Sequence, residues 1–218
     1  MKKLLIFDLD GTLIDTLEDL KNAVNYALKI RKYPERTKEQ IRRAIGNGVA
    51  KLIARSIPDG EANKDYIDTL NDFKKYYASH SVDFTVPYPG VLEALINLKS
   101  QGYLLAVATN KLTEISRPLI EGFYPHIFDY IQGDEPNMER KPSPMMVTSL
   151  CQRFNVSKDE AFYIGDTDVD METAVNSGVD FVLVTYGYRT KNELLELCPN
   201  QPTIDSISEL GEYLKNRI

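Results

Sequence analysis

Two aspartates, Asp8 and Asp10, directly follow a short apolar run and have a spacing that would let them act together. Residues two apart on an extended segment point to the same side, so both carboxylates would face one space. The two carboxylates repel each other unless a cation or a proton lies between them. Gly11 then permits a tight turn, and Thr12 adds a hydroxyl. An isolated pair of this kind is more often a helix cap beside a solvated side chain, so its meaning depends on the other polar segments.

Three further polar segments lie where strands are expected to end or helices to begin: Thr109-Asn110-Lys111, Lys141 and the acidic run from Asp166 to Asp170. A hydroxyl and an amide can donate to an oxyanion, and a lysine can reach a phosphate or hold a carboxylate ionised. The acidic run could complete an oxygen-rich shell, which suits a hard divalent cation and Mg²⁺ best. An EF-hand loop is disfavoured because its glycine and its distant glutamate are missing. Taken alone, Thr109 would be a helix cap and Lys141 a solvated lysine.

Apolar periodicity predicts the elements that position these residues. Residues 4–7 are continuously apolar, which is typical of a buried parallel strand, whereas residues 16–81 show only helical spacing. Residues 82–90 form a proline-rich linker signal. After the linker, helices and strands alternate. We expect helices from about residue 91 and over 115–120, 144–154 and 171–176, and strands over 103–108, 127–131, 161–164 and 181–184.

This alternation predicts an α/β fold with a parallel sheet covered on both faces. The first strand then belongs with everything after residue 82, and the helical block is an insertion. We therefore predict an α/β core of residues 1–15 and 83–218 and a helical domain of residues 16–82. Ligands of open α/β sheets bind outside the carboxyl ends of the strands, where Asp8 and Asp10 are expected.

The composition is that of an ordinary globular protein, with 43% hydrophobic and 27% charged residues in 218. The formal net charge of −6 disfavours a nucleic-acid partner but not a phosphorylated substrate. Cys151 and Cys198 have no metal-ligand spacing and are expected to be reduced thiols. The apolar N-terminal run is too short for a secretory or membrane-spanning segment. We expect a cytoplasmic protein without a membrane partner, either a monomer or a weak homodimer.

The four polar segments, in this order, resemble the motifs of the haloacid dehalogenase superfamily of phosphatases. The first motif reads Asp8-Leu9-Asp10-Gly11-Thr12, the second Val107 to Lys111, the third Lys141-Pro142, and the fourth Gly165 to Asp170. The resemblance covers essentially the whole chain. It implies a doubly wound, Rossmann-like core, and it identifies the helical insertion with the small α-helical cap of that family.

The resemblance also implies a role for each matching residue. Asp8 would be the nucleophile that forms an aspartyl-phosphate, and Asp10 the general acid and then the general base. Lys141 would neutralise charge on the phosphoryl group. The other residues implied to bind phosphate or substrate are Gly11, Thr109, Asn110 and, in a flexible turn of the cap, Gly46 and Asn47.

A Mg²⁺ cofactor is implied in the same way. Asp8, the backbone carbonyl of Asp10 and Asp166 would hold it, and Asp170 would support the shell directly or through water. Neutralising the charge of two anions that must meet is the main requirement of phosphoryl transfer.

Within the superfamily, the sequence is most similar to the phosphoglycolate phosphatase group. Ile45-Gly46-Asn47-Gly48 and Tyr88-Pro89-Gly90-Val91 support this, although such segments are less specific than the catalytic motifs. We therefore predict a Mg²⁺-dependent phosphatase for a small phosphorylated metabolite, with 2-phosphoglycolate favoured. A pyrophosphatase, a sugar-phosphate phosphatase or a nucleotidase would share the same architecture.

Two other functions are disfavoured by particular positions. The related β-phosphoglucomutases usually carry a histidine where this chain has Leu20, and a lysine and an arginine where it has Ile45 and Val49. Loss of those contacts favours hydrolysis over the mutase reaction. A non-catalytic phosphate-binding module of the same fold is disfavoured because every catalytic position is present.

Overall fold

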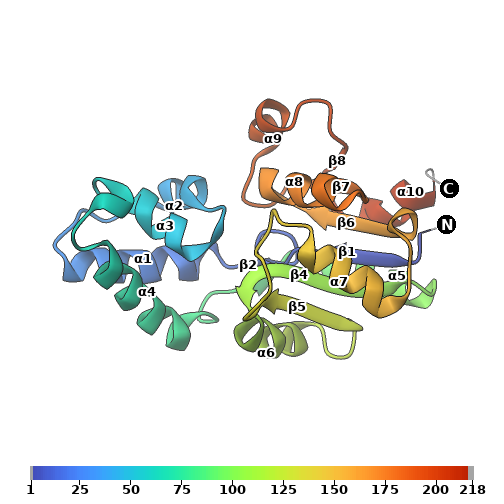
Figure 1. Ribbon diagram of the computed structural model, residues 1–218, viewed down its shortest axis with the longest axis horizontal. Coiled ribbons are helices and arrows are strands. Elements are labelled where there is room, and N and C mark those ends of the chain that lie inside the picture. Colours follow the sequence, from blue (N-terminus) through green and yellow to red (C-terminus); the bar gives the residue numbers. More distant parts are fainter. Residues whose placement is uncertain (1, 216–218) are drawn as a thin grey trace. The chain divides into compact units, whose positions relative to one another are not determined.

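The structure is a computed structural model that describes residues 2–215. The chain divides into two compact units, one formed by the residues up to Ile14 and from Pro87 onward, and one formed by Asp15–Val86 (Figure 1). The second unit begins one residue before the predicted helical insertion and ends four residues after it. Two short strands, β2 (Ile14–Asp15) and β3 (Val86–Pro87), contain these boundaries and pair with each other.

The first unit is built on a six-stranded parallel sheet in the order β5-β4-β1-β6-β7-β8. The strand β1 therefore lies between β4 and β6. It shares one parallel sheet with strands from the later part of the chain, as the sequence predicted. The strands of the sheet are β1 (Leu4–Phe7), β4 (Leu104–Leu112), β5 (Tyr130–Asp134), β6 (Ala161–Gly165), β7 (Asp180–Val184) and β8 (Thr203–Ile204).

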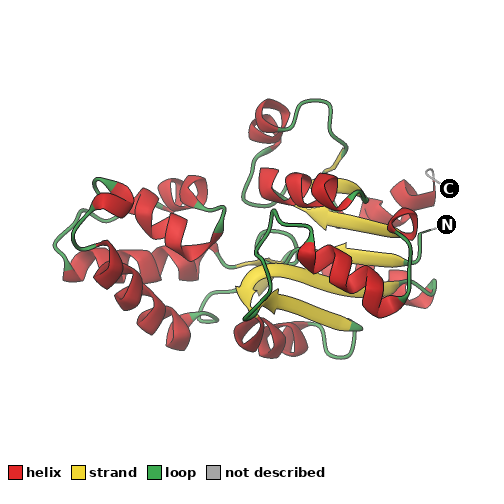
Figure 2. Cartoon of the chain, in the orientation of Figure 1, coloured by secondary structure: helices red, strands yellow, loops and turns green. Residues whose placement is uncertain are grey.

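Helices cover both faces of this sheet (Figure 2). Alternate residues of β1 point to opposite faces, so Leu5 and Phe7 pack with one group of helices and Leu4 and Ile6 with the other. The first group is α5 (Val91–Ser100), α6 (Thr113–Phe123) and α10 (Leu210–Lys215). The second group is α7 (Met145–Phe154), α8 (Asp168–Ser177) and α9 (Lys191–Leu197). Short 3-10 turns span Lys158–Glu160 and Ile207–Glu209.

The predicted strand over 103–108 was too short. In the structure β4 continues to Leu112, because its register against β5 shifts after Ala108 and Leu112 then pairs with Asp134. Thr109, Asn110 and Lys111 therefore lie within the strand and not beyond its end. The strand predicted over 127–131 lies three residues further on, and the helix predicted over 171–176 begins earlier, at Asp168.

The second unit contains helices and no strand of the main sheet among its described residues. Its helices are α1 (Leu17–Ile30), α2 (Lys38–Ala44), α3 (Gly48–Ser56) and α4 (Tyr66–His80), with a 3-10 turn at Gly60–Ala62. Continuous helical spacing through residues 41–53 is interrupted at Asn47, which adopts a left-handed conformation with φ of 63°. In the described part of the chain, no helix combines the length and apolar character that crossing a membrane requires.

A buried carboxylate ties the end of the helical unit to its first helix. Asp19 of α1 accepts hydrogen bonds from the backbone N–H of Phe84, at 3.0 and 3.2 Å, and from the hydroxyl of Thr85 at 2.7 Å. Asp19 is only 2% exposed, so these donors take the place of the water that burial removes.

Replacing Asp19 with alanine should lower the free energy of unfolding by about 1–3 kcal/mol, because the bonds to a charged acceptor are lost and the Phe84 N–H keeps no partner. Urea unfolding followed by circular dichroism would measure this. The matched control is Asp68→Ala, which removes an exposed carboxylate of the same unit and should change stability by no more than about 0.5 kcal/mol. Equal midpoints for the two variants would contradict the anchoring role.

Candidate active site

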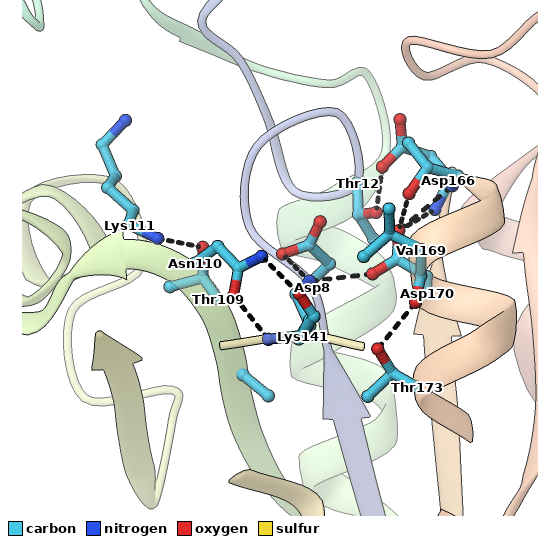
Figure 3. Close-up of polar contacts among 12 residues, drawn as sticks. Asp8, Thr12, Thr109, Asn110, Lys111, Lys141, Asp166, Val169, Asp170 and Thr173 are labelled. Atoms are coloured by element: carbon cyan, nitrogen blue, oxygen red, sulfur yellow. Dashed lines mark hydrogen bonds and ion pairs between the residues drawn. The ribbon is translucent and has the colours of Figure 1, made fainter. Parts of the chain in front are cut away.

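The carboxyl ends of three adjacent strands bring the polar segments together (Figure 3). Asp8 follows β1, and its backbone N–H continues the ladder by donating to the carbonyl of Ile164 in β6 at 2.8 Å. Asp166 follows β6, and Thr109 lies in β4 on the other side of β1. Residues separated by up to 158 positions thus meet because the sheet order places their strands side by side.

Lys141 is the central cation of this site. Its ammonium lies 2.7 Å from Oδ1 of Asp8 and 2.8 Å from Oδ1 of Asp170, and it donates to the hydroxyl oxygen of Tyr163 at 3.1 Å. These three contacts use the three N–H donors of an ammonium group. Lys141 is 4% exposed, so desolvation would be costly without such partners.

The main chain of Lys141 is also held in place. The side-chain amide of Asn110 donates to the Lys141 carbonyl at 3.1 Å and accepts from the Lys141 N–H at 2.8 Å. Asn110 was expected to bind phosphate, and the sequence did not predict that its side chain would hold the main chain of Lys141. The neighbouring Thr109 hydroxyl accepts the N–H of Lys111 at 3.2 Å and can still donate its own proton.

Asp166 and Asp170 are fixed by hydrogen bonds from several elements. Asp166 accepts the Thr12 hydroxyl at 3.1 Å and the Tyr188 N–H at 2.7 Å. Oδ2 of Asp170 accepts the N–H groups of Asp166 and Thr167, at 3.2 and 3.1 Å, and the Thr167 hydroxyl at 2.7 Å. With Lys141 on its other oxygen, Asp170 already has partners on both oxygens, whereas Asp166 has one bond on each.

Three glycines make room for these carboxylates. A Cβ atom at Gly11 would lie 2.3 Å from Asp166, and one at Gly165 would lie 2.3 Å from Asp170. At Gly187 the Cβ would lie 2.4 Å from both the Cβ of Asp166 and the carbonyl oxygen of Gly11. Gly11 also has φ of +95°, which other residues rarely adopt. Gly11, expected to bind phosphate, therefore has a packing role beside Asp166.

Burial and mutual repulsion set the proton affinities of the three buried carboxylates. Burial raises the pKa of Asp8 from 3.8 to about 7, in spite of the lowering charge of Lys141, and Asp170 adds to the rise. Burial also raises the pKa of Asp166 well above its usual value, and the charges of Asp170 and Asp8 raise it further. Burial would raise the pKa of Asp170 as well, but the charge and hydrogen bond of Lys141, together with the hydrogen bonds from Thr167 and the Asp166 N–H, outweigh it and lower that pKa.

These carboxylates are placed so that they could share a cation. Oxygens of Asp8, Asp166 and Asp170 all lie within 4.8 Å of one another. Hard oxygen donors of this kind suit Mg²⁺ or Ca²⁺, and Asp8 and Asp166 have raised pKa values that a bound cation would lower. The side chain of Asp10 forms an ion pair with Lys111, Oδ1 to Nζ 3.0 Å.

The structure thus places Asp8, Asp166, Asp170 and Lys141 together, with Asp10, Gly11, Thr109 and Asn110 in contact with them or with their neighbours. Gly46 and Asn47 lie in the helical unit between α2 and α3, and their contact with substrate stays a prediction. Sequence reasoning missed Tyr163, Gly187 and Tyr188. Tyr163 is a fully buried strand residue and looks like ordinary core in the sequence, while Gly187-Tyr188 carries no motif that would single it out.

Comparison with known proteins identifies the family of this chain. The family model of haloacid dehalogenase-like hydrolases matches residues 5–184, which is more than half of the chain. The chain belongs to the haloacid dehalogenase-like hydrolase family. Curated relatives include phosphoglycolate phosphatases of Aquifex aeolicus, 32% identical over 99% of this chain and 98% of the relative, and of Pasteurella multocida, 35% identical over 91% and 92%.

Solved structures of this family have the same fold. A crystal structure from Lactobacillus delbrueckii subsp. bulgaricus matches with a TM-score of 0.92 at 32% identity and covers 98% of this chain and 99% of the other. That of a predicted phosphoglycolate phosphatase from Haemophilus somnus matches with a TM-score of 0.87 at 31% identity and covers 98% of each chain. The present hydrolase is thus a phosphatase, and its family implies a small phosphorylated substrate.

Replacing Gly187 with alanine should lower the free energy of unfolding of this hydrolase by about 1–3 kcal/mol, because the added methyl overlaps Asp166 and the Gly11 carbonyl, which are both fixed. Urea midpoints would measure the loss. Gly122 lies in α6, and in the matched variant Gly122→Ala the methyl meets no atom within 4 Å apart from the neighbouring backbone of its own helix, so we expect a gain of about 0.4–1 kcal/mol. If both variants were equally stable, close packing around Asp166 would not constrain the site.

Proposed function

We propose that this hydrolase is a Mg²⁺-dependent phosphatase that cleaves a small phosphomonoester, 2-phosphoglycolate before others, through an aspartyl-phosphate. The observation that carries the proposal is the contact of the Lys141 ammonium with Asp8 at the end of β1, beside Asp166 and Asp170. This arrangement supplies a nucleophile, a fixed positive charge and oxygen ligands in one place. The choice of substrate is supported by the phosphoglycolate phosphatases among the relatives.

Asp8 is the proposed nucleophile. Its carboxylate oxygen forms a bond to phosphorus while the bond from phosphorus to the leaving oxygen breaks. Lys141 orients Asp8 and offsets the negative charge that gathers around phosphorus. Thr109 lies in the adjacent strand, and its hydroxyl can donate to a phosphoryl oxygen.

Asp10 is the proposed general acid and base. In the first half-reaction it gives its proton to the leaving oxygen, so that an alcohol departs. In the second half-reaction it takes a proton from the water that attacks phosphorus, which frees Asp8 and releases phosphate. Asp10 lies two residues after Asp8, just beyond the end of β1, which keeps it near the proposed nucleophile.

Asp8 and Asp166 are the side chains that would hold Mg²⁺ directly, with the backbone carbonyl of Asp10 as a further proposed ligand. Asp170 fits a supporting role, because both of its oxygens already accept hydrogen bonds from Lys141, Tyr163, Thr167 and the Asp166 N–H. When bound, the cation would offset the negative charge of the phosphoryl group and of the buried carboxylates.

The helical unit is proposed to serve as the cap that excludes water and selects the substrate. On this proposal the turn at Gly46 and Asn47 contacts the substrate, and the segments around β2 and β3 act as the hinges about which the cap moves. Pyrophosphate, sugar phosphates and nucleotides would be cleaved by the same core residues, so the cap decides among them. A cytoplasmic location and a monomeric or weakly dimeric state belong to the same proposal.

Phosphate release from 2-phosphoglycolate, pyrophosphate, hexose phosphates and nucleoside monophosphates, each with and without Mg²⁺, tests this function. We expect the highest kcat/KM for 2-phosphoglycolate, in the presence of Mg²⁺ only. Asp8→Asn should abolish turnover, and Asp68→Asn, which alters an exposed carboxylate of the helical unit, should not. Wild-type activity in Asp8→Asn would contradict the covalent mechanism, and a higher kcat/KM for another ester would contradict the proposed substrate.

A further inference from the structure

A second lysine lies at the site, in contact with Asp10. The Nζ atom of Lys111 is 3.0 Å from Oδ1 of Asp10, close enough for both an ion pair and a hydrogen bond. Lys111 belongs to β4, and Asp10 follows the adjacent strand β1. Nothing in the steps proposed above uses the Lys111 ammonium.

The main chain of Lys111 is fixed by its neighbours and does not lie on a free loop. Its N–H donates to the Thr109 hydroxyl at 3.2 Å. Gly133 of β5 lies so close that a Cβ atom there would be 2.5 Å from the Lys111 carbonyl oxygen. Strand pairing thus fixes the backbone position from which the Lys111 side chain extends. Binding residues that lie on such rigid elements are held more precisely than residues on loops.

The charges of the site leave Lys111, and not Lys141, to bind a second negative group of the substrate. In the part of the chain that the structure describes, Lys141 contacts two carboxylates and a tyrosine with its three N–H donors. Asp8, Asp10, Asp166 and Asp170 outnumber the two lysines. A substrate that brings a carboxylate as well as a phosphoryl group therefore needs a cation beyond Lys141 and the metal, and Lys111 has the appropriate charge.

We infer that Lys111 is a substrate-binding residue that selects phosphomonoesters with a carboxylate next to the leaving oxygen. This inference rests on the proposed function, in which Asp10 protonates that oxygen. In 2-phosphoglycolate a single methylene separates the leaving oxygen from the carboxylate carbon. A cation hydrogen-bonded to Asp10 therefore lies on the side of the substrate where the carboxylate must be.

A pair of matched esters separates this role from a role in positioning Asp10. In 2-hydroxyethyl phosphate, a neutral CH₂OH replaces the carboxylate of 2-phosphoglycolate. The ratio of kcat/KM for 2-phosphoglycolate to kcat/KM for 2-hydroxyethyl phosphate measures recognition of the carboxylate. We expect Lys111→Gln to lower this ratio by about 10- to 100-fold, because a charge-assisted contact is lost, and Lys111→Arg to retain most of it.

Equal losses on both esters in Lys111→Gln would overturn the inference, because they would mean that Lys111 acts only through Asp10. A wild-type ratio near one would overturn it as well. The matched control is Lys99→Gln. Lys99 also pairs with an aspartate, Asp129, at 2.7 and 2.8 Å. It lies in the last turn of α5, near the start of β4, whereas Lys111 lies near the end of that strand. This control should leave the ratio unchanged.

Binding calorimetry distinguishes failure of the inference from failure of the proposed function. It would use Asp8→Asn, which cannot form the aspartyl-phosphate, with Mg²⁺ and each of the two esters. Tighter binding of 2-phosphoglycolate that disappears in Asp8→Asn/Lys111→Gln would support the carboxylate site, even if the wild type released no phosphate. Equal affinity of Asp8→Asn for the two esters would overturn the inference, even if the wild type hydrolysed both.

Discussion

The buried ammonium of Lys141 must serve two buried carboxylates at once, and the rest of the site is arranged around this constraint. Asp8 and Asp170 lie within 2.8 Å of it, and Asp166 lies close to both carboxylates without touching the lysine. Burial is the main reason why the pKa values of Asp8 and Asp166 are raised, and the negative charge of the neighbouring carboxylates raises them further. A proton or a bound cation would relieve the repulsion among these carboxylates. The same property suits the site to receive a metal ion and a phosphoryl group.

The parallel sheet makes this concentration of charge possible. Its order puts the ends of β4, β1 and β6 next to one another, and helix α8 begins within the acidic run, at Asp168. Glycines at 11, 165 and 187 let three chain segments approach the carboxylates more closely than any Cβ would allow. The hydroxyl of Thr12 and the N–H of Tyr188 then bind Asp166 from two different segments. Side-chain placement thus depends on backbone packing as much as on the charged residues themselves.

Much of this could be predicted from the sequence, because strand ends and alternating apolar residues are local signals. The strand at residues 4–7, the parallel α/β fold and the approach of the acidic run to Asp8 followed from them, whereas the place of Lys141 at the site was implied by the resemblance to the haloacid dehalogenase motifs. The continuation of β4 to Leu112 could not, because it depends on a shifted pairing with Asp134 in β5. Tyr163 was missed for a related reason: its hydroxyl matters only because Lys141 and Asp170 converge on it from other segments.

The dependence of stability on pH without divalent cations reports directly on the crowding of Asp8, Asp166 and Asp170 around one lysine. Asp8 has a pKa of about 7 in the folded chain and near 3.8 when unfolded, so between these values the folded chain retains a proton that the unfolded chain has lost. Rising pH should therefore lower the free energy of unfolding through this window in the presence of a chelator. We expect this decline to be smaller in Asp8→Asn, and smaller in the wild type with Mg²⁺. Identical pH profiles for wild type and Asp8→Asn in chelator would contradict the account.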